Sequence, residues 1–314
     1  MFRMKSIKTF LGAVLCCVLW GSAFPVIKIG YDLWGIDGSE TMKIIEFAGW
    51  RFFLAGVLVI LFESGRKKTL ILPKKTELPK IMKLSLFQTI GQYILFYLGL
   101  AHTSGVNAAV VDSLTTVFAI LVASFLFRTE KLTGWKLIGC VAGFIGVTII
   151  NLTGDGFQLN LLGDGLVTLS AFCYGISSSM IKKYSAKHDT VMLSGYQFLF
   201  GGLVMSIFGM SGGKSSVIKN PDHIFSAMAI LLYLALVSSV AYTLWGILLR
   251  RNEVSKIAIF GFMTPVAGAV LSMLLLGEAK LFDIRYVIAL ILISLGILLV
   301  NKTKKENSSD RFDE

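Results

Sequence analysis

Residues 226–249 read SAMAILLYLALVSSVAYTLWGILL, a run of 24 residues without a charged side chain. A helix rises about 1.5 Å per residue, so this run would span about 36 Å. The hydrocarbon core of a bilayer is only about 30 Å thick. The run therefore predicts a membrane-spanning helix.

Similar apolar runs recur along the chain, and each is long enough for a spanning helix. They cover residues 10–30, 47–63, 83–101, 105–127, 134–151, 162–181, 191–210, 254–277 and 283–300. None of them shows the two-residue alternation of an outer-membrane barrel strand. The sequence thus predicts an all-α membrane protein with ten transmembrane helices.

The composition and the charge distribution agree with this fold class. Of the 314 residues, 55% are hydrophobic and 16% are charged, whereas a soluble domain carries about 25% charged residues. The net charge of +11 would suggest a nucleic-acid partner in a soluble protein, but Lys and Arg also collect in the cytoplasmic loops of membrane proteins. If the N-terminus is cytoplasmic, 23 of the 30 Lys and Arg residues lie on that side. We therefore expect no nucleic-acid partner and two cytoplasmic termini.

Matched residues in the two halves of the chain indicate an internal repeat. Matches occur at separations of 146 to 154 residues; they pair Ala55-Gly56 with Gly201-Gly202, Trp20-Gly21 with Tyr174-Gly175, Glu130 with Glu278, and Asn151 with Asn301. Each half holds five expected helices, and because five is odd the second half enters the membrane from the opposite side. We expect two inverted five-helix repeats at residues 11–151 and 163–301, followed by a short cytoplasmic tail at 302–314. This architecture is common among secondary transporters.

Several short motifs resemble those of the drug/metabolite transporter superfamily, specifically its EamA-type members with two five-helix repeats. The motifs are Leu19-Trp20-Gly21-Ser22-Ala23-Phe24, Trp50-Arg51-Phe52, Phe262-Met263-Thr264-Pro265-Val266, Leu276-Gly277-Glu278, residues 139–147 and Leu295-Gly296-Ile297. The resemblance implies a multi-pass carrier of the inner cell membrane that exports amino acids or other small metabolites. It also implies a central cavity between the helices. One departure is Val117, which stands where the first repeat would have the counterpart of Pro265, so symmetrical gating by these two helices is not expected.

Polar and aromatic residues inside the expected helices are the candidate substrate-binding residues. Two stripes stand out: Gln88, Gln92, Tyr93 and Tyr97 in the third helix, and Ser239, Tyr242 and Trp245 in the eighth. Trp20 and Tyr174, which match each other in the repeat, and Thr116 complete the set. Such faces could line a cavity, or the same groups could satisfy one another as interhelical contacts. Both interpretations stay open for the individual residues.

Asp112 and Pro265 are the candidates for coupling and for a hinge. Asp112 lies about 10 Å along the fourth expected helix, where an unpaired carboxylate would favour its protonated form. We expect it to contact a cationic substrate group or to carry a coupling proton, unless a neighbouring hydroxyl satisfies it. Pro265 removes a hydrogen bond from the ninth helix, which allows either a hinge or a static kink.

The sequence offers no arrangement typical of catalysis or of a bound cofactor. The four cysteines lie in apolar runs without a CxxC or Cys/His cluster, and no GxxxxGK[ST] motif is present. Lys28 and Lys182 would extend to the membrane interface. Arg51 could attract an anionic group, pair with Glu46 or anchor at headgroups. We expect no cofactor, no metal and no enzymatic activity.

The expected partners are a small-molecule substrate, the lipid bilayer and a proton or sodium ion, with the chain as a monomer or homodimer. The alternatives are an integral-membrane enzyme that acts on lipid-linked substrates and a non-transporting receptor or assembly subunit.

Overall fold

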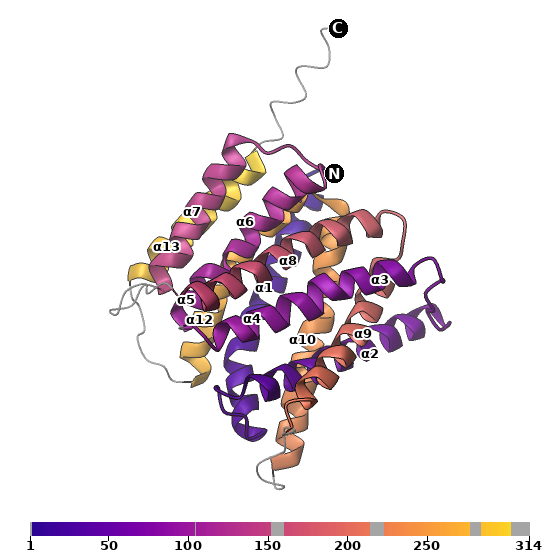
Figure 1. Cartoon of the computed structure of the whole chain (residues 1–314). Coiled ribbons are helices and arrows are strands. Elements are labelled where there is room, and N and C mark those ends of the chain that lie inside the picture. Colours follow the sequence, from indigo (N-terminus) through magenta and orange to yellow (C-terminus); the bar gives the residue numbers. More distant parts are fainter. Residues whose placement is uncertain (1, 104, 152–159, 214–222, 277–283, 303–314) are drawn as a thin grey trace.

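The computed structural model describes residues 2–103, 105–151, 160–213, 223–276 and 284–302. These residues form a bundle of helices without any strand (Figure 1). The elements are α1 (Phe2–Leu33), α2 (Thr41–Lys67), α3 (Leu78–Ser85), η1 (Leu86–Gly91), α4 (Gln92–Leu100), α5 (Gly105–Asp112), α6 (Leu114–Leu121), η2 (Val122–Leu126), α7 (Gly134–Asn151), α8 (Leu161–Ser185), α9 (Thr190–Met210), α10 (Ile224–Arg251), α11 (Val254–Ala258), η4 (Ile259–Phe262), α12 (Met263–Leu276) and α13 (Ile284–Lys302).

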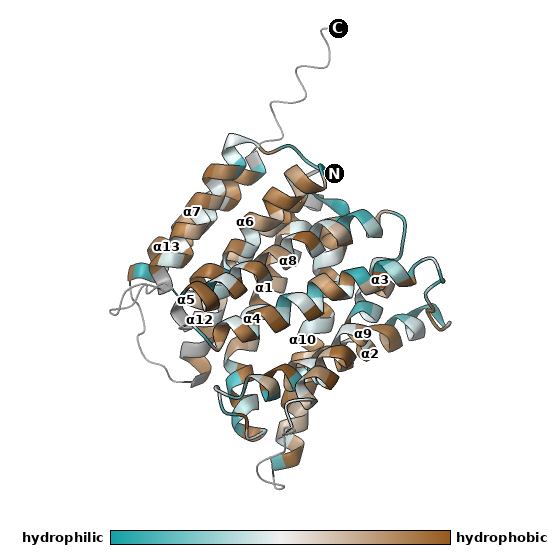
Figure 2. Cartoon of the chain, viewed as in Figure 1, coloured by the Kyte–Doolittle hydropathy of each residue, from teal (hydrophilic) through white to brown (hydrophobic). Residues whose placement is uncertain are grey.

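Seven helical stretches in the described ranges are long and apolar enough to cross a membrane. They are Ile7–Leu33, Thr41–Lys67, Ala108–Leu126, Leu161–Ser185, Thr190–Met210, Ile224–Arg251 and Val254–Leu271. Hydrophobic residues run along the helices, and hydrophilic residues gather at helix ends and loops (Figure 2). Large apolar side chains such as Phe62, Leu274 and Leu298 are exposed, as expected of a surface whose solvent is lipid. The chain is therefore an all-helical, multi-pass membrane protein.

Three of the expected helices are interrupted. The helical stretch 78–100 contains the π-helical segment η1, the stretch 105–126 breaks at Ser113, and the stretch 254–276 contains the 3₁₀ segment η4. The last break has a covalent cause. Pro265 has no N–H to donate to the carbonyl of Gly261, four residues earlier. Gly261 lies in η4, which directly precedes α12. Pro265 itself lies in the first turn of α12, where a proline is tolerated.

The π-helical segment also changes one sequence-based expectation. Gln88 lies within η1 and Gln92 begins α4, and the N–H of Gln92 donates to the carbonyl of Phe87, five residues back. A π turn takes more residues than an α turn. The regular α-helical spacing assumed for Gln88 and Gln92 is therefore not present, although both side chains are buried, and their role in substrate binding stays a prediction.

A few pairs of helices make the main contacts of the bundle. α2 packs along α9, and α7 packs along α13, which lie side by side in Figure 1. α1 packs against α10 and α12, and α8 packs against α4 and α6. The buried side chains between α1, α2, α4, α9 and α10 form one of the apolar cores, and this core surrounds the candidate site.

Candidate functional site

Four of the residues singled out from the sequence meet at the centre of the bundle. The hydroxyl of Tyr93 on α4 is hydrogen-bonded to the hydroxyl of Tyr242 on α10. The Trp20 ring on α1 packs edge-on against Tyr242, with 5.0 Å between ring centroids, and against Trp245 at 4.9 Å. We call Trp20, Tyr93, Tyr242 and Trp245 the aromatic cluster. It joins three helices that are distant in sequence.

Further aromatic rings extend the aromatic cluster toward α2 and α9. Phe52 of α2 lies 4.5 Å from the Tyr93 ring, and Phe198 of α9 lies 5.1 Å from the Tyr242 ring. The Tyr97 ring, another residue expected from the sequence, lies 6.1 Å from Tyr93. On the opposite side, Tyr174 of α8 interacts with the side chain of Trp245. The surroundings are therefore aromatic on several sides, with hydroxyls directed inward.

Three polar atoms of this site lack a hydrogen-bond partner. Trp20 Nε1, Trp245 Nε1 and Gln92 Oε1 are buried, and no residue in the described ranges bonds to any of them. Buried polar atoms are nearly always hydrogen-bonded, because an unmade bond costs free energy. A polar ligand could supply the missing partners.

Asp112 ends α5, at the break before α6. Its side chain is partly buried and forms no hydrogen bond or ion pair with any residue that the structure describes. The carboxylate does act electrostatically on the Tyr242 hydroxyl, so it lies near the aromatic cluster. Among the described residues, no neighbouring hydroxyl is hydrogen-bonded to Asp112.

Thr116 and Ser239 have structural partners. The Thr116 hydroxyl donates to the Ala258 carbonyl at 3.2 Å, and the Cys17 thiol donates to the Phe260 carbonyl at 3.2 Å. Both acceptors lie at η4, where the irregular turn frees backbone carbonyls. Ser239 donates to the Leu236 carbonyl of its own helix at 2.9 Å. Gln88 is buried on η1 and forms no hydrogen bond with the aromatic cluster.

The sequence did not predict the environment of Arg51. This residue is 4% exposed, its Nε donates to the Ser238 hydroxyl at 2.9 Å, and its guanidinium lies 5.0 Å from the centroid of the Phe52 ring. A signal was available, because none of the residues three or four positions away is acidic. A helical arginine with no acid on its own face must find its counter-charge elsewhere.

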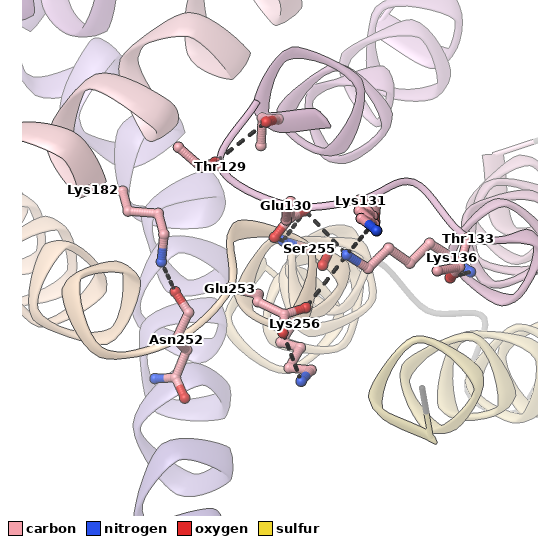
Figure 3. Close-up of polar contacts among 11 residues, drawn as sticks. Thr129, Glu130, Lys131, Thr133, Lys136, Lys182, Asn252, Glu253, Ser255 and Lys256 are labelled. Carbon is pink, nitrogen blue, oxygen red and sulfur yellow. Dashed lines mark hydrogen bonds and ion pairs between the residues drawn. The ribbon is translucent and has the colours of Figure 1, made fainter. Parts of the chain in front are cut away.

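A second group of polar residues joins two interhelical segments at one end of the bundle (Figure 3). The Lys136 amine lies 3.6 Å from Glu130 Oε1 and 3.3 Å from Glu253 Oε2, and the Glu130 carboxylate accepts the Ser255 backbone N–H at 3.1 Å. We call Glu130, Lys136, Glu253 and Ser255 the Glu130 cluster. The side chains of Lys136 and Glu130 are almost fully buried. The segment between η2 and α7 is thus tied to the segment between α10 and α11.

Glu253 and Lys182 show how this end of the bundle is held. Burial raises the pKa of Glu253, but the charges of Lys256 and Lys136 outweigh burial and leave the pKa below its usual 4.5. The Lys182 amine donates to the carbonyls of Leu249 (at 3.2 Å) and Asn252. The last carbonyls of α10 have no partner within their own helix and accept from this amine. The expected extension of Lys182 to the membrane interface stays a prediction.

Metal ligation has no support in the described parts of the chain. No group of three or more His, Cys, Asp or Glu side chains there could hold a metal ion. All four cysteines are buried free thiols. The polar chemistry of the site is therefore that of hydroxyls, one carboxylate, one guanidinium and indole N–H groups.

Comparison with known proteins adds the family. The model of the EamA-like transporter family matches residues 7–152 and again residues 161–302. The chain belongs to this family. Its expected resemblance to EamA-type transporters is thereby confirmed.

Individual relatives agree with the family. An uncharacterized transporter of Archaeoglobus fulgidus is 28% identical over 86% of this chain and 90% of that protein. A Salmonella typhimurium protein named as a probable amino-acid metabolite efflux pump is 26% identical, over 85% of this chain and 86% of its own length. A crystal structure at 17% identity superposes with a TM-score of 0.76 over 94% of this chain and 96% of the other, which supports the fold alone.

Proposed function

We propose that the protein exports small organic metabolites, amino acids or related compounds, across the inner cell membrane by alternating access. The proposed topology has ten membrane spans in two inverted repeats, 11–151 and 163–301, with both termini in the cytoplasm. Three helical stretches with internal breaks (78–100, 105–126 and 254–276) count as one span each. The relatives named for amino-acid efflux support the substrate class.

Reciprocal packing between α2 and α9 is the observation that carries the proposal. A Cβ added to Gly56 would lie 2.7 Å from the Gly195 carbonyl oxygen, and one added to Gly202 would lie 2.7 Å from the Gly49 carbonyl oxygen. Gly56 and Gly202 are 146 positions apart in the sequence, as are Gly49 and Gly195. The two contacts are therefore copies of one another with the halves exchanged, as a two-fold repeat requires.

The pair α7 and α13 shows the same relation. A Cβ on Gly139 would lie 2.8 Å from the Gly296 carbonyl oxygen, and a Cβ on Gly146 would lie 3.1 Å from the Ala289 carbonyl oxygen. Gly139 and Ala289 are separated by 150 positions, as are Gly146 and Gly296. Small residues at these points let the helices approach closely.

The central helices exchange partners in the same way. Gly21 of α1 packs on Ala267 of α12, and Gly175 of α8 packs on Phe118 and Ala119 of α6. Ser113, where one stretch breaks, lies 148 positions before Gly261 in the break of the other. Both halves therefore have an irregular fourth span, although only the second has Pro265. Two similar halves that swap conformations would exchange an inward-open cavity for an outward-open one.

The proposed substrate site is the aromatic cluster with Gln92, Tyr97, Tyr174 and Asp112. The unpartnered Trp20 Nε1 and Gln92 Oε1 support polar contacts to a ligand, and the rings support an apolar part. Thr116 and Pro265 belong in this proposal to the moving break rather than to direct ligand contact. Asp112 has the position of a group that binds a substrate ammonium or carries a coupling proton.

Purified protein in liposomes tests the transport function. Under imposed proton or sodium gradients, we expect uptake or counterflow of at least one compound from a panel of labelled amino acids and related metabolites. A matched control is protein with Tyr93→Phe and Tyr242→Phe, which keeps both rings but removes both hydroxyls and should slow transport. Failure to move any member of the panel would contradict the proposal, and turnover of vesicle lipid without translocation would favour a lipid-linked enzyme.

A further inference from the structure

The depth of Arg51 in the bundle makes its charge costly. It lies ten residues after Thr41, the start of α2, and therefore about 15 Å along the helix. α2 has 27 residues and is about 40 Å long, so Arg51 lies three residues before the middle of the helix. Charged side chains at such depth usually face the bundle interior and mark a pathway for a substrate or an ion. Arg51 does face inward, since it is buried.

The protein supplies very little to balance this charge. Ser238 accepts one hydrogen bond from Nε, and the Phe52 ring offers a cation–π contact. No carboxylate among the described residues forms an ion pair with Arg51, and its remaining N–H groups have no acceptor there. A guanidinium presents five N–H donors, two of which fit a carboxylate side by side. Most of this donor set is therefore available to a ligand.

The surroundings of Arg51 are those of a small anionic group beside an apolar body. The Phe52 ring beside the guanidinium packs against the Tyr93 ring, with 4.5 Å between centroids, and the Tyr93 hydroxyl is hydrogen-bonded to that of Tyr242. Hydroxyls from α4 and α10 therefore lie in the surroundings of the arginine. Phenolic hydroxyls can donate to a carboxylate, and their rings can pack against an apolar side chain.

A charge of the opposite sign lies within reach of the same tyrosine. Asp112 and Arg51 both act on the Tyr242 hydroxyl, yet they form no ion pair with each other. Arg51 and Asp112 are therefore separate charged groups in the surroundings of one tyrosine. A zwitterion with its carboxylate toward Arg51 and its ammonium toward Asp112 would match both charges.

We propose that Arg51 binds the carboxylate of the transported compound, and that the substrate class is zwitterionic amino acids with apolar side chains. This assignment rests on the proposed transport function and deepens it. Arg51 was not needed for the fold-level proposal, and the Ser238 contact alone would give it only a structural role. The two roles differ in one measurable respect: only ligand binding makes affinity depend on the ligand carboxylate.

The test uses matched ligands that differ only at the carboxyl group. Full-length protein in lipid nanodiscs is titrated with L-phenylalanine and L-phenylalaninamide, and with L-leucine and L-leucinamide. The readout is the intrinsic fluorescence of the five tryptophans, two of which, Trp20 and Trp245, lie in the aromatic cluster. We expect wild type to bind at least one acid about tenfold or more tightly than its amide. Arg51→Gln should bring acid and amide within about twofold, and Arg51→Lys should retain part of the preference.

A second measurement needs no variant, in case Arg51→Gln does not fold. The arginine reagent phenylglyoxal is applied to wild type, and modification of Arg51 is followed by mass spectrometry. L-Phenylalanine or L-leucine should protect Arg51, whereas the amides should not. Ser238→Ala, which removes the structural contact, should keep the preference for acids.

The outcomes separate this assignment from the transport function. Equal affinity for acids and amides, binding of neither, or a preference that survives in Arg51→Gln overturns the role of Arg51. Carboxylate-dependent binding by a protein that moves nothing in liposomes supports that role and removes the transport function. Transport that depends on neither the ligand carboxylate nor Arg51 supports the transport function and overturns the role of Arg51.

Discussion

Lys136→Met would test whether the Glu130 cluster closes the cytoplasmic end of the proposed transporter. The substitution keeps much of the side-chain volume but removes the charge that lies between Glu130 and Glu253. Glu130 would then be a buried carboxylate whose remaining partner is the Ser255 N–H. The free-energy cost of burying Glu130 without Lys136 applies only while the two segments are in contact, because separation of the segments exposes Glu130 to water.

The size of the effect follows from this burial. Removing one partner of a buried ion pair costs about 3–5 kcal/mol. The lower end applies here, since Glu253 is 39% exposed and its share is screened by solvent. About 3 kcal/mol corresponds to a shift of about 150-fold in the equilibrium toward the open form.

Labelling of a cysteine at position 88 measures that shift. In a Gln88→Cys background the four native thiols are buried, and inside-out vesicles expose the cytoplasmic face to a membrane-impermeant maleimide. We expect Lys136→Met to raise the labelling rate tenfold or more. Lys136→Arg should restore a slow rate, and the exposed Lys131→Met is the matched control. A lower Tm with an unchanged labelling rate would refute the reasoning and leave the cluster a role in folding only.

Four further predictions concern other parts of the chain. Asp112→Asn should abolish pH dependence or accumulation against a gradient if Asp112 carries a coupling proton; wild-type transport at every pH would remove that role. Pro265→Ala should slow transport more than it lowers Tm, whereas equal losses would make the proline architectural. Gly202→Ala should destabilise by about 1–3 kcal/mol, because the new Cβ would lie 2.2 Å from the Phe53 nitrogen; Gly65→Ala, in open space, is the control in thermal unfolding. Asp189 caps α9; burial raises its pKa, but Lys67 and two backbone N–H groups outweigh burial and hold the pKa below 3.8. The stabilisation that Asp189 gives the folded state is therefore present above about pH 3.8 and is lost as pH falls through the lower folded-state pKa. The free energy of unfolding of Asp189→Ala should be lower than that of wild type at pH 7 and should converge with it in acid.

The sequence predicted the helical fold because apolar runs report directly on the cost of placing polar groups in lipid. It indicated a break only at Pro265 and did not predict the other two. Whether an irregular turn forms depends on partners for the freed carbonyls, and at η4 these come from distant residues, Thr116 and Cys17. The break at Ser113, in the half without a proline, shows that no local signal was sufficient.

The candidate site was predicted in part for a related reason. Trp20, Tyr93, Tyr242 and Trp245 lie on inward faces, and inward faces of neighbouring helices meet. The role of Arg51 depends instead on which charged groups lie near it in the folded chain. The sequence shows that no acid lies three or four positions away on its own helix, but which residues of other helices lie beside it is a property of the tertiary structure.

The glycine contacts between α2 and α9 have the form of an isologous interface within a single chain. Gly56 meets Gly195 while Gly49 meets Gly202, as corresponding residues do across the two-fold axis of a symmetric dimer. Under the proposed alternating access, such a contact would map onto itself when the two halves exchange conformations, so it need not break during the exchange. The contacts of α1 with α12 and of α8 with α6 would map onto each other instead and would trade geometries. The proposal therefore keeps the α2–α9 and α7–α13 pairs as a fixed frame within which α1, α6, α8 and α12 rearrange.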